Sequence, residues 1–506
     1  MDTTKTPGTG VGDGTGLRYG TPAGRWVLTA TVLGSAIASI DATVVGIALP
    51  AIGRDFGTGL ASLQWVVTAY TLTLAGLLLV AGALSDRYGR RRVFLTGVVW
   101  FAAASTLCAV APGPDSLIAA RALQGVGAAL LTPGSLAILE ASFRPEDSGR
   151  AIGAWSGLSG VATAVGPFIG GWLVAAASWR LIFLINLPVA AAVVALSWRH
   201  VPESRDPDAN GRVDLPGGVL VTAGLMGLTY GMIEGPSRGW GTLPVLGTLL
   251  GGAVLLAGFI LRERRATRPL LPLRLFRSAQ FSAANVVTFI VYGALGGALF
   301  LLPIQLQQVS GYSALEAGVS LLPVTVITLA LSARSGALAA RIGPRLQMSV
   351  GPVAVGAGFA LFTRIGPAGD YMSEVLPAVC VFGLGLAITV APLTATVLSA
   401  VDARHAATAS AVNNDVARAA ALVAVALFPA AAGITGDAYL HPGQFSNGFH
   451  TAALIAAALC VFGGLLAAVI IHNPRTPAVP TPAPWHCGID APPSAMAPTR
   501  RATPSS

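Results

Sequence analysis

The stretch GALSDRYGRRR at residues 82–92 places five charges in eleven positions, directly after a long uncharged run. Its outline returns 254 residues later as GALAARIGPRL at residues 336–346, with six positions identical. In each copy an apolar run leads into a basic turn with a glycine near its centre, and glycine permits a tight turn. The chain is therefore predicted to consist of two similar halves.

The composition of the chain excludes a soluble protein. Of its 506 residues, 54% are hydrophobic and only 10% are charged, whereas soluble domains are about one quarter charged. A net charge of +9 would suggest a nucleic-acid partner in a soluble protein, but here it fits loops that face anionic lipid. The four cysteines show no disulfide or metal-ligand spacing. We expect a protein that crosses the membrane repeatedly and binds no nucleic acid.

Runs of about 20 apolar residues cross a bilayer as helices, because about 30 Å of hydrocarbon must be spanned. The sequence predicts fourteen spans, and the fifth and thirteenth are the weakest because they carry many glycine or polar residues. The predicted spans are 26–48, 63–84, 93–111, 115–139, 150–176, 181–198, 214–234, 242–261, 279–302, 315–337, 346–363, 374–399, 405–430 and 449–471. Each basic turn follows the second span of a six-span group, so the seventh and eighth spans form an inserted pair.

These spans predict an all-helical membrane fold with two six-helix halves and two inserted central helices. Two similar halves of this kind are a transporter plan, with a substrate site between them near the midplane. The predicted segments are a tail at 1–25, a first half at 26–198, an inserted segment at 199–278, a second half at 279–472 and a disordered tail at 473–506.

The distribution of basic residues predicts the orientation. Most of the 31 arginine and lysine residues fall on one side of the predicted membrane, and basic loops remain in the cytoplasm. The other side holds only Arg54, Arg180, Arg238 and Arg364. Both termini are therefore expected to be cytoplasmic.

The first basic turn is interpreted as a conformational latch. The residues of this latch are Gly82, Asp86, Arg87, Gly89, Arg90 and Arg91. Asp86, at a helix end, can pair with an arginine or with the positive N-terminus of a neighbouring helix, and so hold the two halves in one state. The second copy has Ala340 in place of Asp86, as expected if only one latch is needed.

The basic turn resembles the loop signature of the major facilitator superfamily, and the similarity covers roughly residues 25–472. Further stretches resemble the fourteen-helix branch of drug:proton antiporters, although Gly46 stands where that branch usually has asparagine. These stretches are IDATVVGIALP at 40–50, LQWVVTAYTL at 63–72, RALQGVGAALLTPGSLAIL at 121–139, VGPFIGGWL at 165–173, SWRLIFLINLP at 178–188 and LPIQLQQVSGYSALEAGVSLLP at 302–323. The resemblance implies export of small drug-like compounds in exchange for protons, by a monomer in a bacterial cell membrane.

Two charged residues fall inside predicted spans of the first half. A charge at the bilayer centre costs about 2.5–3.5 kcal/mol on insertion scales, so it faces a partner or a cavity. Asp41 has no basic residue one turn away and is interpreted as a lone acid that binds and releases the coupling proton; a structural hydrogen-bond acceptor is the alternative. Arg121 needs acceptors, either Asp41 or the backbone, and the resemblance implies a part in proton coupling. Gln124, one turn further on the same face, is a candidate for binding water or substrate.

A polar patch in the thirteenth span is expected to line the cavity. It consists of Asn413, Asn414, Asp415 and Arg418. Asp415 and Arg418 are three residues apart and can neutralise each other within one helix, which is favoured over a functional role. The family resemblance does not extend to Asp415.

The fifth span carries the antiporter motif Gly166, Pro167, Gly170 and Gly171. Pro167 removes a helix hydrogen bond and kinks the span. These glycines, with Gly160, let another helix pack closely. In exporters that resemble this chain, such a contact is thought to restrict leakage and favour antiport; ordinary membrane packing is the alternative.

The motifs of other function classes are absent from the sequence. The single lysine, Lys5, is not part of a phosphate-binding loop, and the six histidines lie at span ends, in loops or in the tail. We expect no enzyme, no metal and no cofactor other than the proton gradient. A metabolite exporter or a nutrient symporter is the alternative, and a transporter-like sensor is a remote one.

Overall fold

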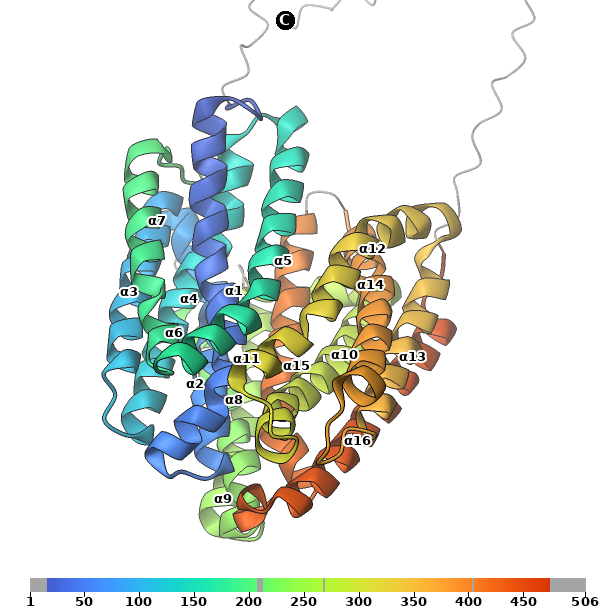
Figure 1. Ribbon diagram of the computed structural model, residues 1–506. Coiled ribbons are helices and arrows are strands. Elements are labelled where there is room, and N and C mark those ends of the chain that lie inside the picture. The colour runs from blue at the N-terminus through green and yellow to red at the C-terminus, as the bar shows by residue number, and fades with distance from the viewer. Residues whose placement is uncertain (1–15, 207–212, 267–268, 403–404, 474–506) are drawn as a thin grey trace, which may run out of the picture. The chain divides into compact units, whose positions relative to one another are not determined.

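The computed structural model describes residues 16–206, 213–266, 269–402 and 405–473, and Figure 1 shows the arrangement of their helices. The regular structure in these ranges is helical, apart from an isolated bridge between Leu17 and Phe143. The helices belong to one compact unit that ends at His472. The predicted all-helical class is confirmed, while the predicted disorder of the C-terminal tail falls outside the described residues.

The first half contains six spans, and the last of them consists of two consecutive helical segments. They are α1 (Pro22–Phe56), α2 (Leu60–Tyr88), α3 (Arg90–Ala109), α4 (Pro114–Ser142), α5 (Pro145–Ala176) and the pair α6 (Leu181–Leu184) and α7 (Asn186–His200). The helix α1 begins where the Thr21 hydroxyl accepts a hydrogen bond from the Gly24 amide, and it ends at Gly57, whose φ is 58°.

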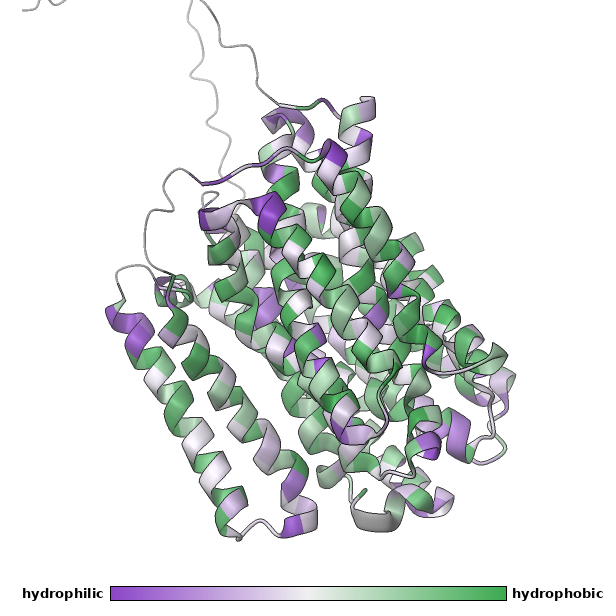
Figure 2. Ribbon diagram, turned by 90° about the vertical axis from the view of Figure 1, so that its left-hand side faces the viewer, coloured by the Kyte–Doolittle hydropathy of each residue, from purple (hydrophilic) through white to green (hydrophobic). Residues whose placement is uncertain are grey.

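The inserted pair consists of α8 (Leu215–Arg238) and α9 (Leu243–Arg265). Figure 2 shows it as a hairpin beside the bundle, apolar along its length and polar at its ends. The second half contains η1 (Leu273–Arg277), α10 (Ala279–Ile304), η2 (Gln305–Val309), α11 (Ala314–Ser320), α12 (Leu322–Ile342), α13 (Pro344–Phe362), η3 (Tyr371–Val375), α14 (Leu376–Ser399), α15 (Ala406–Ala431), η5 (Gly436–Leu440) and α16 (Pro442–Ile470).

The predicted spans correspond to helices in the described part of the chain. Thirteen helical segments there are long and apolar enough to cross a membrane. The one predicted span outside that group is the eleventh, at 346–363, which is α13; Arg345 and Gln347 in its first turn dilute its apolar character. It nevertheless packs against α14 and α16 inside the second half.

The internal repeat predicted from the two basic turns is visible in the packing. In the first half α1 contacts α5 and α7, and α4 contacts α2 and α3; in the second half α10 contacts α15 and α16, and α14 contacts α12 and α13. Gly89, between α2 and α3, has a φ of 112°, and Gly343, between α12 and α13, has a φ of 84°. Both turns therefore require a glycine in the region that other residues avoid.

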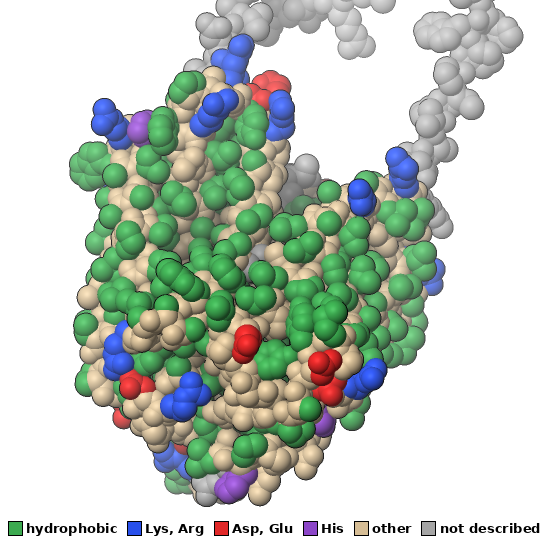
Figure 3. All heavy atoms as spheres, in the orientation of Figure 1, with side chains coloured by type: hydrophobic (Ala, Val, Ile, Leu, Met, Phe, Trp, Pro, Cys, Tyr) green, Lys and Arg blue, Asp and Glu red, His purple; other side chains and the backbone are tan. Residues whose placement is uncertain are grey.

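The two ends of the helix bundle differ in how the halves meet. We call the end with the turns at Gly89 and Gly343 the basic end, and the opposite one the closed end. At the closed end one apolar core includes residues from both halves, such as Val45, Phe300 and Phe445. At the basic end each half has an apolar core of its own, and Figure 3 shows the surface hollowed between the halves there. The described chain is thus open toward its basic end.

Candidate functional site

A buried polar cluster lies in the middle of the first half, where α1, α3, α4 and α7 meet. Asp41 of α1 and Arg121 of α4 are each 1% exposed, and Gln124 is completely buried. Arg121 and Gln124 are three residues apart, so α4 presents both side chains on the face that packs against α1 and α3. The fold therefore collects polar side chains that are far apart in the sequence.

The carboxylate of Asp41 accepts hydrogen bonds on both oxygens. Arg121 Nη1 donates to Oδ2 in a direct ion pair. Gln124 Nε2 donates to Oδ1 at 2.8 Å, and Asn186 Nδ2 donates to the same oxygen at 3.2 Å. The interpretation of Asp41 as a lone acid without a nearby base is wrong, because α4 brings Arg121 against it across the helix interface.

Arg121 is held from several sides. Its Nε donates to the carbonyl oxygen of Val66 at 3.1 Å, and its Nη1 donates to Gln124 Oε1 at 2.6 Å. The guanidinium carbon lies 4.2 Å from the centre of the Tyr70 ring, a favourable cation–π distance. Both acceptors that the sequence allowed for Arg121, Asp41 and the backbone, are thus used.

Three further residues complete the cluster and were missed by the sequence reasoning. Ser105 Oγ accepts from Gln124 Nε2 at 2.8 Å and from Asn186 Nδ2 at 3.3 Å. The Tyr70 hydroxyl donates to the carbonyl of Ala38, which lies three residues before Asp41 on α1. Asn186 stands as a polar residue within an apolar run, and that signal could have identified it. In the described ranges no cluster of His, Cys, Asp and Glu is arranged to hold a metal.

The glycines of α5 lie at two helix crossings. A Cβ atom on Gly170 would stand 3.0 Å from Cγ1 of Val44 on α1, and one on Gly166 would collide with Thr43. A Cβ on Gly171 would collide with the backbone of Ala314 on α11, so this crossing joins the two halves. Gly160 faces open space, and its predicted part in close packing is wrong. The remaining motif glycines allow the short distances that the sequence predicted.

Pro167 contributes to the same crossing from its backbone. Its carbonyl oxygen lies where a Cβ on Gly318 of α11 would sit, so glycines approach from both helices. The motif of α5 therefore lies at the closed end, where the first half meets the second.

The charged residues of the basic turn are satisfied inside the first half. Asp86 Oδ1 accepts from Arg90 Nη2 at 3.0 Å. Glu203, which follows α7, accepts from the Arg91 amide at 3.1 Å and lies 3.9 Å from the Arg91 Nε. A Cβ on Gly89, whose φ of 112° already requires glycine, would also stand 2.7 Å from Glu203 Oε1. In this conformation Asp86 holds its own half together, and Glu203 is a partner that the sequence reasoning did not identify.

The other latch residues occupy the helix ends beside this turn. The Arg87 guanidinium lies over the Tyr88 ring at 5.2 Å. A Cβ on Gly82 would touch only Pro133 of α4, at 4.0 Å. Neither contact joins the two halves.

The polar patch of α15 divides into two parts. Asn413 donates to Asn285 Oδ1 at 3.1 Å and to Thr288 Oγ1 at 2.8 Å, so it bonds to α10 and not to the open space between the halves. Asn414 is exposed and donates to the Ser410 carbonyl. Asp415 and Arg418 form no direct ion pair, because no such contact within 4.0 Å joins them and both Asp415 oxygens and the Arg418 Nε lack a hydrogen-bond partner in the described chain.

Glutamine side chains join the halves at the closed end. Gln64 Nε2 of α2 donates to the Val425 carbonyl of α15 at 2.7 Å, and Gln307 Nε2 of η2 donates to the Ile47 carbonyl of α1 at 2.9 Å. Pro429, four residues after Val425, has no N–H, so it leaves that carbonyl free of its helix bond. In the first bond the donor belongs to the first half, and in the second bond the donor belongs to the second half.

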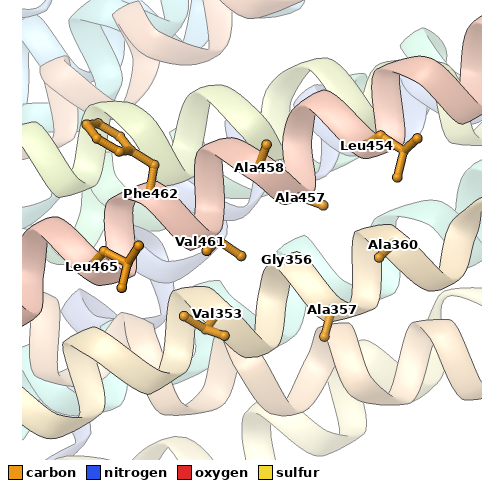
Figure 4. Close-up of a pocket in the computed structure, with 10 residues that line it drawn as sticks. All are labelled: Val353, Gly356, Ala357, Ala360, Leu454, Ala457, Ala458, Val461, Phe462 and Leu465. Carbon is orange, nitrogen blue, oxygen red and sulfur yellow. The ribbon is translucent and has the colours of Figure 1, made fainter.

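A shallow groove between α13 and α16, shown in Figure 4, is separate from these polar groups. Its lining consists of Val353, Gly356, Ala357, Ala360, Leu454, Ala457, Ala458, Val461, Phe462 and Leu465. These side chains offer no hydrogen-bonding group, so the groove suits a hydrocarbon chain and not a polar ligand.

Comparison with known proteins supplies the context for this geometry. The family model described as Major Facilitator Superfamily matches residues 31–426. The tetracenomycin C resistance and export protein of Streptomyces glaucescens is 39% identical over 65% of this chain, which matches only 60% of that protein's length. The methylenomycin A resistance protein of Bacillus subtilis is 38% identical over 79% of this chain and 86% of its own length.

A solved structure shows the same fold at low identity. The crystal structure of a bacterial homologue of the human lysosomal transporter Spinster, inward-facing and unoccupied, has a TM-score of 0.63 and 15% identity. The similarity covers 89% of this chain and 97% of that one. At this identity the likeness concerns the fold alone.

Proposed function

Because this chain belongs to the major facilitator superfamily, we propose that it exports amphipathic drug-like compounds from a bacterial cell in exchange for protons. Export of such compounds agrees with the names of its relatives, which include a resistance and export protein. The observation that carries the exchange with protons is the buried carboxylate of Asp41, held by donors from two other helices.

The transport cycle we propose is alternating access. The basic end faces the cytoplasm in this orientation, together with both termini, because basic loops remain inside the cell. The described conformation, open at its basic end, then receives the compound from the cytoplasm. Rocking of one half against the other opens the closed end outward, which requires the α5–α11 crossing and the glutamine bonds to separate.

Asp41 is the proposed carrier of the exchanged proton. When Asp41 takes a proton from outside, its ion pair with Arg121 is lost, while the Val66 carbonyl and the Tyr70 ring continue to hold the guanidinium. Tyr70 also bonds to α1, so a change at this pair reaches the helix that lines the space between the halves. One proton gains about 2.3 kcal/mol per 100 mV of membrane potential, which supports a gradient of roughly tens-fold.

An efflux assay tests the proposal. The intact gene is expressed in a host without its own pumps, and accumulation of a panel of antibiotics and dyes is measured with and without a protonophore. We expect export that collapses with the proton gradient and that Asp41→Asn abolishes at equal membrane expression. Asp115→Asn, at an exposed acid of α4, is the matched control and retains export. Uphill export by Asp41→Asn, or after collapse of the gradient, would refute the assignment.

A further inference from the structure

The two charges on α15 stand out because the chain itself does not satisfy them. Both carboxylate oxygens of Asp415 and the Nε of Arg418 are buried and have no hydrogen-bond partner among the described residues. No ion pair within 4.0 Å joins the two side chains, although a spacing of three residues would allow one. By contrast, the buried charges of Asp41 and Arg121 satisfy each other.

The position of these charges on α15 points toward the seam between the halves. Leu422, seven residues after Asp415 and therefore on the same face, packs against Leu72 of α2 and Leu225 of α8. Asn413 faces the other way and bonds to α10. Asp415 thus lies on the side of α15 that meets the first half.

The Arg418 side chain belongs to the same region. It lies four residues before Leu422 and therefore on the face of α15 that packs against α2. Residues 415–419 are only partly buried, although the Asp415 carboxylate oxygens themselves are covered. The charges therefore line the wall of the space that opens at the basic end, next to the cluster around Asp41.

Unpaired charges at this depth need a partner. A charge within a membrane span is costly unless it meets a counter-charge or a cavity, and such residues mark the path of a substrate. Removing water from a charge without pairing it costs more than burying a satisfied one. Since the Asp415 carboxylate and the Arg418 Nε have no hydrogen-bond partner among the described residues, a bound compound is the natural source of one.

We propose that Asp415 and Arg418 form the subsite of the second half that selects the substrate, which rests on the export function proposed above. Asp415 accepts hydrogen bonds from a protonated amine or another cationic group of the compound. Arg418, about 4.5 Å further along the helix axis, donates to a carboxylate or another oxygen acceptor. The substrate class is therefore amphipathic amines that carry an oxygen acceptor near the amine.

Equilibrium binding to the purified protein in detergent at pH 7, with no gradient, tests this subsite apart from transport. Three fluorescent probes separate the roles of the two charges: rhodamine 123, a cationic ester; rhodamine 110, which has the same fluorophore with a free carboxylate; and Nile red, which is neutral. The variants are Asp415→Asn, Arg418→Gln and the control Asp115→Asn.

We expect Asp415→Asn to weaken binding of both rhodamines at least about tenfold and binding of Nile red less than twofold. Arg418→Gln should weaken binding of rhodamine 110, whose carboxylate carries a charge, more than binding of rhodamine 123, whose ester is a neutral acceptor, and the control should change none of the three. Equal loss for all probes would mean a structural role and would overturn the proposal, as would unchanged rhodamine binding or no saturable rhodamine binding to the native protein. If these expectations hold but export survives loss of the proton gradient, the exchange mechanism fails and the subsite stands.

Discussion

The two halves of this protein pack their helices in the same register but fill that packing with different side chains. A Cβ on Gly127 of α4 would stand 2.7 Å from the backbone nitrogen of Phe101 on α3, and one on Gly385 of α14 would collide with the same atom of Val355 on α13. Phe101 and Val355 are 254 residues apart, the offset between the two basic turns. Within each half, two neighbouring helices thus bring their backbones close together at equivalent places.

Close to this shared contact the two halves carry opposite kinds of side chain. The first half has Ser105, Cys108 and Gln124 where the second has Phe359, Phe362 and Phe382. The polar set surrounds the Asp41–Arg121 pair, whereas the three rings pack on one another with centroids 5.1–6.0 Å apart. One half encloses charge and its repeat encloses aromatic carbon.

The contrast between the polar cluster and the aromatic cluster separates what the fold needs for stability from what the proposed proton exchange needs. Aromatic pairs gain about 0.5–1.5 kcal/mol beyond the area that they bury, whereas a buried ion pair scarcely repays its loss of water. The second half shows that the fold itself needs no charge at this position. We infer that the charges of the first half are kept for the proposed exchange with protons.

The largest expected effect comes from breaking the ion pair of the first half. Arg121→Leu leaves the Asp41 carboxylate buried without its counter-charge and should lower the free energy of unfolding by about 3–5 kcal/mol. The double variant Asp41→Leu with Arg121→Leu, which makes this place apolar as in the second half, should recover most of that loss and remain inactive in transport. Thermal unfolding in detergent and proton-driven efflux measure the two properties. A double variant as unstable as the single one would contradict the separation of stability from chemistry.

The reciprocal change in the second half should affect stability alone. Phe382→Ala opens a cavity in the ring cluster and should cost about 3 kcal/mol of unfolding free energy. Because Phe382 is buried among Phe359 and Phe362, we expect the number of protons exchanged per compound to stay unchanged. This number follows from the voltage dependence of transport in vesicles. A changed number would show that the aromatic half takes part in coupling.

A smaller effect is expected at the closed end, where the halves touch. Gln307→Ala removes a bond to α1 of the other half, whereas Gln308→Ala removes a bond of similar length to Tyr439 of its own half. A bond of this kind contributes about 1 kcal/mol, so Gln307→Ala should shift the balance toward the outward-open state roughly fivefold. Distances between spin labels on the two halves report this balance, and Gln308→Ala should leave it in place. Equal shifts in both variants would rule out an inter-half role for Gln307.

The smallest effect concerns the inserted pair, which belongs to neither half. Asp214 accepts from Arg262 Nε at 2.8 Å and from the Gly217 amide at 2.9 Å, and these contacts hold the Asp214 pKa below its usual value. The stability that they provide is present above the ordinary carboxyl pKa and is lost as the pH falls through the lowered one. Asp214→Asn should therefore unfold at a slightly lower temperature than the native protein at pH 7, and at the same temperature in strong acid. A difference that persists in acid would mean that charge is not its cause.

Much of the fold followed from local sequence, because a bilayer demands long apolar helices and the basic turns mark their ends. The repeat of residues 82–92 at 336–346 identified the two halves, and the helices of the described chain agree with the predicted spans. The division of the sixth span into α6 and α7 at Ile185 was not predicted, although the backbone of Ile185 stays right-handed helical there. Hydropathy reports the length of a span and not its internal geometry.

The site was only partly predictable. Asp41, Arg121 and Gln124 were recognisable because polar groups are costly inside apolar runs, yet the pairing of Asp41 with Arg121 was left open and Ser105 was missed. Asp415 and Arg418 suggested a local pair by their spacing, but no hydrogen bond joins their side chains. Spacing along one helix indicates which side-chain contacts are possible. The packing of the neighbouring helices determines which of these contacts form.

The sequence by itself determined that this chain crosses a membrane in two related halves and which few polar residues enter the bilayer, because the cost of burying polar groups acts on each residue separately. Only the tertiary structure decided that four helices of the first half enclose an ion pair, that the closed end is joined across both halves, and that the Asp415 carboxylate has no hydrogen-bond partner among the described residues. Those outcomes depend on distances between helices remote in sequence, and electrostatic and hydrogen-bond energies are set by those distances.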